Sequence, residues 1–521
     1  MTPSARRVAP VAIIAVAAFA LVWSRLVPVG QSLWADEIKS VTAYIRPGPA
    51  AIYGHYLAND HILFELLTWA TTALTGARSA AAYRFWGVVP GIAAAVILTR
   101  WLWRRIDPWV AALFALFATA SPIYYTLCVD ARGYGLGFLA ASCVLIGADT
   151  YVRTGSRRAL GLLGVAAVGG IWTLPVFALP VGAVLGLIAL DRRDRLRLVL
   201  ITAGLVAVAS VTLYAPVLPQ VLAASRQSFG QPLPWYGFAS GPFTDLIAPE
   251  LLVAVHGINP TSTLTLAPGA SAPIPGTSGW ATWIAAALVL VGFAVTVRVR
   301  RERFLAMACL VPAVFTYAVL DLARIHTVNR FASFLLLPLL ALSAIGVVTM
   351  ARWVVSTRAA APVLAGLVAA GFAGFMFVRT DDMLRVLQAA PYENDKLIAA
   401  VVRTADIAPV VTNFNGGDTS YYLGSWTASR RSAGQLEALF CSSGDELTYL
   451  DELLAPDQPS TACLRQRDAI EVRIPQRHTT AATAGSPFTV WLLRPELLVQ
   501  RRQIESGSGA SASRTFRAAR W

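Results

Sequence analysis

Long apolar segments alternate with short basic segments along most of the 521-residue chain. Runs of about 20 predominantly apolar residues are long enough to cross a bilayer as helices. The pattern predicts about eleven membrane spans, which makes the chain an α-helical polytopic membrane protein. The predicted spans fall near 9–29, 84–102, 109–126, 134–151, 158–173, 174–190, 197–217, 280–297, 304–321, 331–350 and 359–378.

Basic residues gather in clusters on alternate connections between these spans. Because loops rich in Lys and Arg stay in the cytoplasm, we expect a cytoplasmic N-terminus and an outer position for everything after the last span. The clusters are Arg6/Arg7, Arg100–Arg105, Arg153–Arg158, Arg192–Arg197, Arg298–Arg303 and Arg352/Arg358. The first loop (30–83) and the loop 218–279 then fall on the outer face. The first span resembles a signal peptide, but its length and the lack of a small-x-small cleavage site favour a retained span.

Composition supports a membrane protein. Hydrophobic residues make up 56% of the chain, charged residues only 14%, and the mean hydropathy is +0.58, whereas soluble domains carry about a quarter charged residues. The net charge of +14 would suit nucleic acid. Because the basic residues form the orientation clusters, we expect the lipid bilayer as a partner and no nucleic acid. No P-loop or GxGxxG motif precedes a predicted helix, so no nucleotide site is expected.

Two stretches outside the spans have their own patterns. The segment 61–76 is too short and too polar for a confident span, and its helical spacing predicts an amphipathic helix in the membrane interface. After the last span, 391–407 predicts a helix, and 408–414, 469–475 and 488–495 predict short strands. We therefore divide the chain into a transmembrane domain (1–379), a small extracytoplasmic α/β module (380–500) and a disordered basic tail (501–521).

Cysteines occur in both main parts of the chain. Cys128, Cys143 and Cys309 lie in apolar spans and are interpreted as packing residues. Cys441 and Cys463 share the outer module, where oxidation is permitted, so a disulfide and two free thiols are both open. No CxxC or spaced Cys/His cluster indicates structural zinc.

Polar clusters at the outer ends of the spans carry the candidate chemistry, because ionisable residues at membrane depth are functional candidates by default. Asp36 and Glu37 form the first cluster. Neighbours on a helix project about 100° apart, so one acid can face a reacting centre while the other holds a basic partner. The alternative is a pair of solvated acids that a helix N-terminus favours.

The second cluster lies between two predicted spans. Asp130 and Arg132 end one of them, and Gly133, Gly135 and Gly137 open the next. A guanidinium beside closely packed glycine backbone suits a phosphate oxygen. The alternative is an interfacial ion pair, with glycines that serve helix packing.

The third cluster precedes a late span. Arg324, His326 and Arg330 follow Asp321 on the predicted outer face. They are candidates for contact with an anionic ligand, and interfacial anchoring is the alternative.

The order of these motifs resembles a known family. The stretches are WADE (34–37), NDH (59–61), DARGY (130–134) after a Ser-Pro span, and NRF followed by LLLP (329–338). Together they are similar to GT-C glycosyltransferases of the protein-mannosyltransferase and lipid A aminoarabinose transferase type. That family consists of polytopic enzymes that use polyprenyl-phosphate sugars on the outer face of the membrane. The resemblance covers most of residues 30–350.

The resemblance implies roles for individual residues. By position, Asp36 looks like the catalytic base with Glu37 in support, and Arg132 and Arg330 match arginines that address the lipid phosphate. The further cations for the phosphate would be Lys39 and His326. The implied sugar and acceptor pocket comprises Asn59, Asp60, His61, Asp130 and Tyr134. His61 is alternatively an interfacial cap, and the chain departs from the family at 59–64, where many relatives have His-Pro-Pro.

The implied reaction is transfer of a hexosyl or pentosyl unit from a polyprenyl-phosphate donor to a lipid, glycan or protein acceptor, with inversion. The Ala- and Arg-rich composition is typical of a GC-rich bacterium, which favours mannose or arabinose donors in a bacterial cytoplasmic membrane. No cofactor is identified, and a divalent cation on the acidic pair stays open. Two alternatives are a polytopic lipid or polysaccharide flippase, which would carry polar residues in mid-span, and a scaffold that binds envelope polymer.

Overall fold

The structure is a computed structural model of the chain. It describes residues 5–26, 28–30, 33, 35–54, 56, 60–224, 227–228, 231–232, 279–322, 333–354, 410–412, 428–430, 447–451, 470–474 and 488–493. The chain divides into two compact units. One comprises Met1–Gln31 and Lys39–Met383, and the other comprises Ser32–Ile38 and Leu384–Trp521. The acidic pair of the first loop therefore groups with the C-terminal part of the chain.

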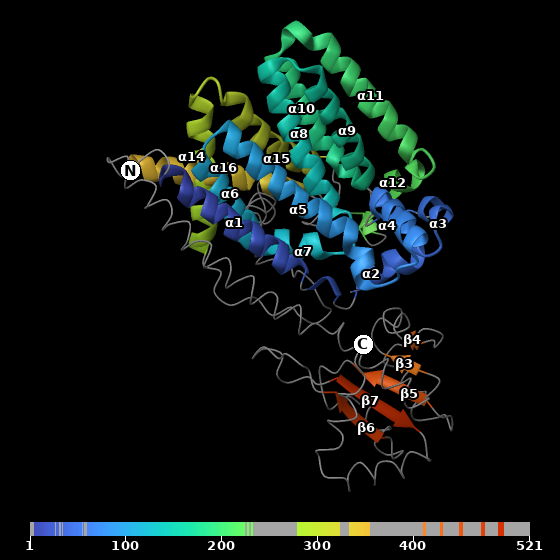
Figure 1. The fold of residues 1–521 in the computed structure, drawn as a ribbon. Helices are drawn as coiled ribbons and strands as arrows, with labels where there is room; N and C mark the ends of the chain where they lie inside the picture. The colour runs from blue at the N-terminus through green and yellow to red at the C-terminus, as the bar shows by residue number, and fades with distance from the viewer. Residues whose placement is uncertain are drawn as a thin grey trace. The chain divides into compact units, whose positions relative to one another are not determined.

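The first unit is a bundle of helices (Figure 1). Six of its described helical segments are long and apolar enough to cross a membrane. The corresponding helices are α1 (Ala5–Leu26), α5 (Ala80–Arg105), α8 (Tyr134–Thr154), α11 (Leu196–Tyr214), α15 (Arg303–Leu322) and α16 (Leu336–Val354). Each predicted span from 9–29 to 331–350 coincides with a helix or a pair of helices, whereas 359–378 lies outside the described residues.

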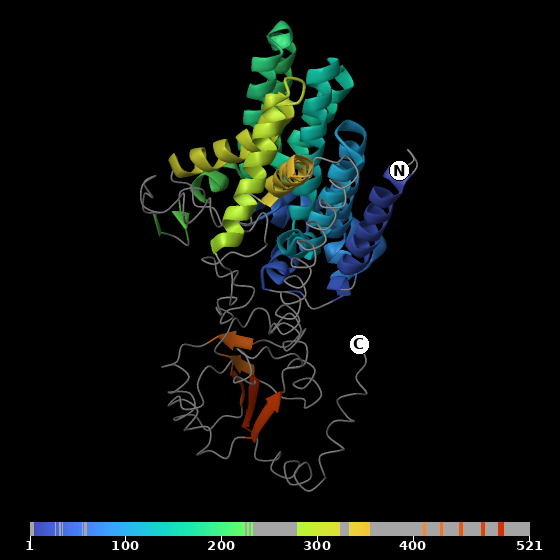
Figure 2. The same cartoon turned by 90° about the vertical axis from the view of Figure 1, so that its left-hand side faces the viewer.

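Five further helices of the described part complete the bundle. They are α6 (Pro108–Ala120), α7 (Pro122–Val129), α9 (Arg157–Thr173), α10 (Ala178–Asp191) and α14 (Gly279–Arg298). Helix α8 packs against α5, α9, α10 and α15, and α16 packs against α14 and α6. Figure 2 shows α14, α15 and α16 in yellow and orange beside the blue-green helices.

One predicted span is broken in the structure. The stretch 109–126 forms α6 and α7 with a break at Ser121, whose ψ of 115° is extended. Steric conflict with the ring of Pro122 disfavours the helical conformation at the preceding residue. The Ser121 hydroxyl then caps α7 by accepting a hydrogen bond from the amide of Tyr124 (3.4 Å). The prediction of one continuous span is therefore wrong at this point.

The first loop and the loop after α11 contain short helices. These are η1 (Pro28–Gly30), α2 (Ala35–Lys39), the π-helix η2 (Ser40–Ile45), α3 (Pro49–Gly54), α4 (Ile62–Thr75) and α12 (Leu218–Ala224). The predicted helix 61–76 is confirmed as α4, which packs against η2, α3, α5 and α9. Two strands, β1 (Gln227–Ser228) and β2 (Gln231–Pro232), form a small antiparallel pair. Most of the loop 218–279 lies outside the described residues.

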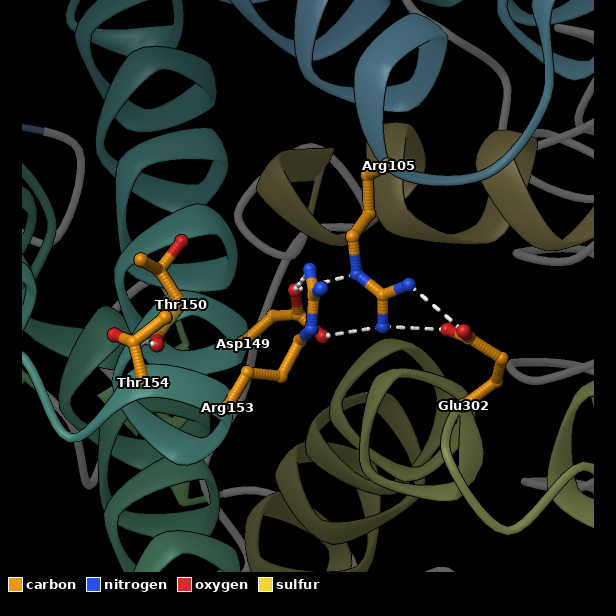
Figure 3. A network of polar contacts seen from close by, with 6 residues as sticks. All are labelled: Arg105, Asp149, Thr150, Arg153, Thr154 and Glu302. Carbon is orange, nitrogen blue, oxygen red and sulfur yellow. Dashed lines mark hydrogen bonds and ion pairs between the residues drawn. The ribbon is translucent and has the colours of Figure 1, made fainter.

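Ion pairs join the basic ends of three helices (Figure 3). Arg105 at the end of α5 binds both carboxylate oxygens of Asp149 on α8, at 2.9 and 3.2 Å. Its terminal nitrogens also bind Glu302, which precedes α15, at 2.8 and 2.5 Å. Arg153 lies 3.8 Å from Asp149 on the exposed side. The predicted basic clusters of these helices therefore meet at one end of the bundle.

The described part of the second unit contains a five-stranded mixed sheet. Its order is β4 (Ala428–Arg430), β3 (Val410–Thr412), β5 (Leu447–Asp451), β7 (Phe488–Leu493) and β6 (Ile470–Ile474). Strand β3 is parallel to β4 and β5, whereas β7 is antiparallel to β5 and β6. The three predicted strands coincide with β3, β6 and β7. The predicted helix 391–407, Cys441 and Cys463 lie outside the described residues.

Candidate functional site

A cluster of buried polar residues lies at the end of the bundle where α8 begins. Asp149 follows Tyr134 by 15 residues of α8, so this polar cluster lies about 22 Å along the helix from the Arg105 network. The members come from η2, from the start of α4 and from the turn before α8. They are Tyr44, Asp60, His61, Glu65, Arg132 and Tyr134. Three segments far apart in the sequence therefore meet here.

His61 joins the first loop to α8. Its ring lies edge-on to Tyr134, with centroids 4.9 Å apart. A Cβ at Gly133 would lie only 2.8 Å from His61 Nδ1 and would also collide with Thr173 of α9. Glycine at this position thus permits the two segments to approach. His61 also occupies the N-cap position of α4, but its side chain does not accept a capping hydrogen bond.

Arg132 is the buried cation of the cluster, with 1% of its surface exposed. Its guanidinium carbon lies 6.0 Å from the centre of the Tyr134 ring. The turn that carries it is closed by its own amide, which donates to the Asp130 carbonyl at 2.8 Å. The charge of Arg132 acts on both Tyr44 and Glu65. Arg132 is therefore the positive centre of an otherwise acidic and phenolic environment.

The glycines after Arg132 have different neighbours. A Cβ at Gly135 would collide with the carbonyl of Gly87 on α5, so this glycine allows α5 and α8 to pack closely. A Cβ at Gly137 would be 3.4 Å from Leu174. Of the two interpretations of these glycines, phosphate binding and helix packing, helix packing accounts for Gly135.

Tyr44 and Tyr56 surround the acids. Burial raises the pKa of Tyr44, and the neighbouring carboxylate of Asp60 raises it further. Burial likewise raises the pKa of Tyr56, with additional contributions from Asp60 and Glu65. Both phenols therefore stay protonated and are available as hydrogen-bond donors.

Glu65 was not anticipated as a site residue. It lies in the first turn of α4, is 1% exposed, and neither carboxylate oxygen accepts a hydrogen bond from a described residue. Burial raises its pKa well above the usual range, Asp60 adds to this effect, and Arg132 opposes it. An acid inside the apolar stretch 61–76, one helical turn after His61, is the sequence signal that would have identified it.

Arg25 is a second buried cation that sequence reasoning missed. Its guanidinium lies 5.4 Å from the ring of Tyr124 and 5.2 Å from that of Tyr125, and it donates to the carbonyls of Ala118 and Thr119. These carbonyls belong to the last turn of α6, where a cation is favourable. Arg25 therefore secures the end of the broken span.

The remaining predicted residues are distributed as follows. Asp130 and Glu37 are buried, and Lys39 is exposed. The side chain of Asp36 and the residues Asn59, His326 and Arg330 lie outside the described part of the chain. Within that described part, no three His, Cys, Asp or Glu side chains gather closely enough to hold a metal ion. The structure thus brings together Asp60, His61, Arg132 and Tyr134 from the predicted set.

Comparison with known proteins gives similarity of structure only. No model of a sequence family and no curated protein sequence matches the chain. Apo ArnT from Cupriavidus metallidurans superposes with a TM-score of 0.56 at 13% identity, over 94% of this chain and 98% of that chain. The same ArnT bound to undecaprenyl phosphate gives 0.57 at 13% identity, with the same coverage. The chain therefore shares the fold of ArnT.

Proposed function

We propose that this protein is a membrane glycosyltransferase that moves a sugar from a polyprenyl-phosphate donor to a cell-envelope acceptor. The observation that carries the proposal is the buried guanidinium of Arg132 at the start of α8. It occurs in a fold shared with ArnT, which has been crystallised with undecaprenyl phosphate. The planar guanidinium group of an arginine matches the geometry of phosphate oxygens.

The chemistry requires a cation and a base. The acceptor hydroxyl loses its proton to a carboxylate, its oxygen forms a bond to the anomeric carbon, and the bond from that carbon to the phosphate oxygen breaks. The phosphate leaves with the bonding electron pair, so Arg132 stabilises the negative charge that develops. Attack from the face opposite the phosphate inverts the anomeric configuration.

We assign the base to Asp36 and its support to Glu37, on the resemblance of the WADE stretch to the family. Arg330 is the second proposed phosphate ligand, and Asn59, Asp60, His61 and Tyr134 are proposed for the sugar and acceptor pocket. In the orientation that the basic clusters predict, the Arg105 end of the bundle is cytoplasmic and the Arg132 end faces outward.

Purified full-length protein should transfer radiolabelled mannose or arabinose from decaprenyl phosphate to an envelope extract. Asp36→Asn should lower the rate by about 10²–10⁴, the usual effect of losing a general base, while donor affinity is retained. Asp194→Asn is the control, because it removes an exposed acid in the turn after α10 that pairs only locally, with Arg192 and Arg195 among the described residues. Turnover by Asp36→Asn at the wild-type rate would remove Asp36 from the mechanism.

A further inference from the structure

Glu65 is a buried acid that the mechanism above does not use. It comes from α4, and its two oxygens lack hydrogen-bond donors among the described residues. Ionising a carboxyl group in that environment costs free energy, because a buried charge is stable only when it is paired and hydrogen-bonded. Arg132 favours the ionised form of Glu65, whereas burial and Asp60 favour the protonated form.

Titratable groups face Glu65 from each element around it. The groups that interact with it electrostatically or lie directly beside it are Tyr44, Tyr56, Asp60, His61, Arg132 and Tyr214. From α3 and α5 come Tyr53, Tyr83 and Arg84, whose side chains bind other groups. Arg46, at the C-cap of η2, donates to Tyr83. The phenols are protonated and neutral, so an ionised Glu65 would add negative charge beside Asp60. A second anion at Arg132 would therefore be repelled strongly by an ionised Glu65.

We propose that Glu65 couples donor binding to a proton: its carboxyl is protonated when a phosphate occupies Arg132, and its ionised form excludes the phosphate. This inference rests on the proposed function, since it requires the donor phosphate to bind Arg132. The proton comes from solvent or is already present on the carboxyl, and no covalent bond changes. In its protonated form Glu65 can also donate a hydrogen bond to a phosphate oxygen.

The coupling has a definite direction with pH. A ligand that binds the protonated form raises the pKa of Glu65 further, so affinity is highest at low pH and falls as Glu65 ionises. One coupled proton gives a decline of at most about tenfold per pH unit. The phosphate titrates too, but in the same way in every variant. Comparison of variants at each pH therefore isolates Glu65.

The test measures binding of undecaprenyl phosphate to the purified full chain in nanodiscs from about pH 5 to about pH 9, the range in which buried carboxyls ionise. Glu65→Gln keeps the shape of the side chain and cannot ionise. The ratio of the wild-type Kd to the Glu65→Gln Kd should rise with pH, approaching about tenfold per unit. Asp194→Asn, which removes an exposed acid far from the polar cluster, should follow the wild type. A ratio that stays constant across the range would overturn the inference.

Two further arms cover the other outcomes. If Glu65→Gln does not fold, calorimetry of the wild type in two buffers of different ionisation enthalpy still counts protons. Uptake of up to one proton at high pH beyond that of the phosphate itself is expected, and none would overturn the inference. Arg132→Gln tests the proposed function separately. Equal affinity of Arg132→Gln and wild type at every pH would show that the phosphate binds elsewhere.

Discussion

Arg132 and Glu65 both act electrostatically on Tyr44 and carry opposite formal charges, yet only Arg132 was recognisable from the sequence as a site residue. Arg132 lies two residues after an aspartate and directly before a glycine, at the end of a predicted span. A guanidinium group beside glycine backbone is suited to binding a phosphate oxygen. Glu65 lies within an apolar segment with helical spacing. That spacing predicts a helix and its buried face, but it does not predict which residues contact this face. Its role depends on Arg132, which is distant in the sequence and joins the same cluster only in the folded chain.

Replacing Arg132 by lysine should separate phosphate binding from interfacial anchoring. Lysine keeps the charge but loses the planar pair of donors, so we expect kcat to fall and the donor KM to rise. A charge-assisted hydrogen bond contributes about 1.5–3 kcal/mol, which corresponds to a loss of about 10- to 150-fold in kcat/KM. Arg132→Ala should lose more. Arg330→Lys is measured in parallel, and full activity of both lysine variants would contradict the phosphate role.

At the scale of elements, close helix contacts depend on particular glycines. On α14 and α16 the contact is reciprocal: a Cβ at Gly292 would collide with the carbonyl of Leu342, and one at Gly346 with the carbonyl of Leu288. Small residues let membrane helices approach in this way. These contacts hold α16, whose described residues are mostly buried, in the middle of the bundle.

Adding one methyl group at this crossing should destabilise the protein. We expect Gly292→Ala and Gly346→Ala each to lower stability by about 1–3 kcal/mol, because the collision is with backbone that cannot move aside. Gly204→Ala on α11 is the matched control, since a Cβ there meets nothing within 4 Å and alanine favours helix. Thermal unfolding in detergent measures all three. Equal midpoints for Gly292→Ala and Gly204→Ala would refute the close crossing.

Element positions were largely predictable, and their ends less so. Apolar runs located the helices because burial against lipid or protein needs continuous apolar surface. The break at Ser121 was missed although Pro122 signals it, because the hydropathy pattern continues across the break. The close packing of α5 against α8 at Gly87 and Gly135 could not be predicted either. The sequence of one helix does not show which other helix packs against it.

At the scale of the molecule, the Arg105 network joins α5, α8 and the start of α15. Arg105 and Asp149 side chains are 5% and 2% exposed, whereas Arg153 is 35% exposed. Arg105→Gln removes the cation of Glu302 and leaves the buried Asp149 with only the more exposed Arg153, so it should cost about 3–5 kcal/mol. Arg153→Gln should cost at most about 1 kcal/mol, as expected for a solvated pair. Thermal unfolding midpoints compare them, and equal losses in the two variants would show that the network does not hold these helices.

The chain positions of these residues set the order in which the ion pairs of the network can form during synthesis. Asp149 follows Arg105 by 44 residues, and Glu302 follows it by 197. Chains are made at about 5–20 residues per second, so the first acid reaches Arg105 several seconds before the second is translated. During that interval the Arg105–Asp149 ion pair can already join α5 and α8 at one end. The turn that carries Arg132 lies at the other end of α8. Helix α15 then packs against α8 and α10, which are already in place. A nascent chain that stops before α15 still contains the segments of the polar cluster from the first loop, α4 and α8.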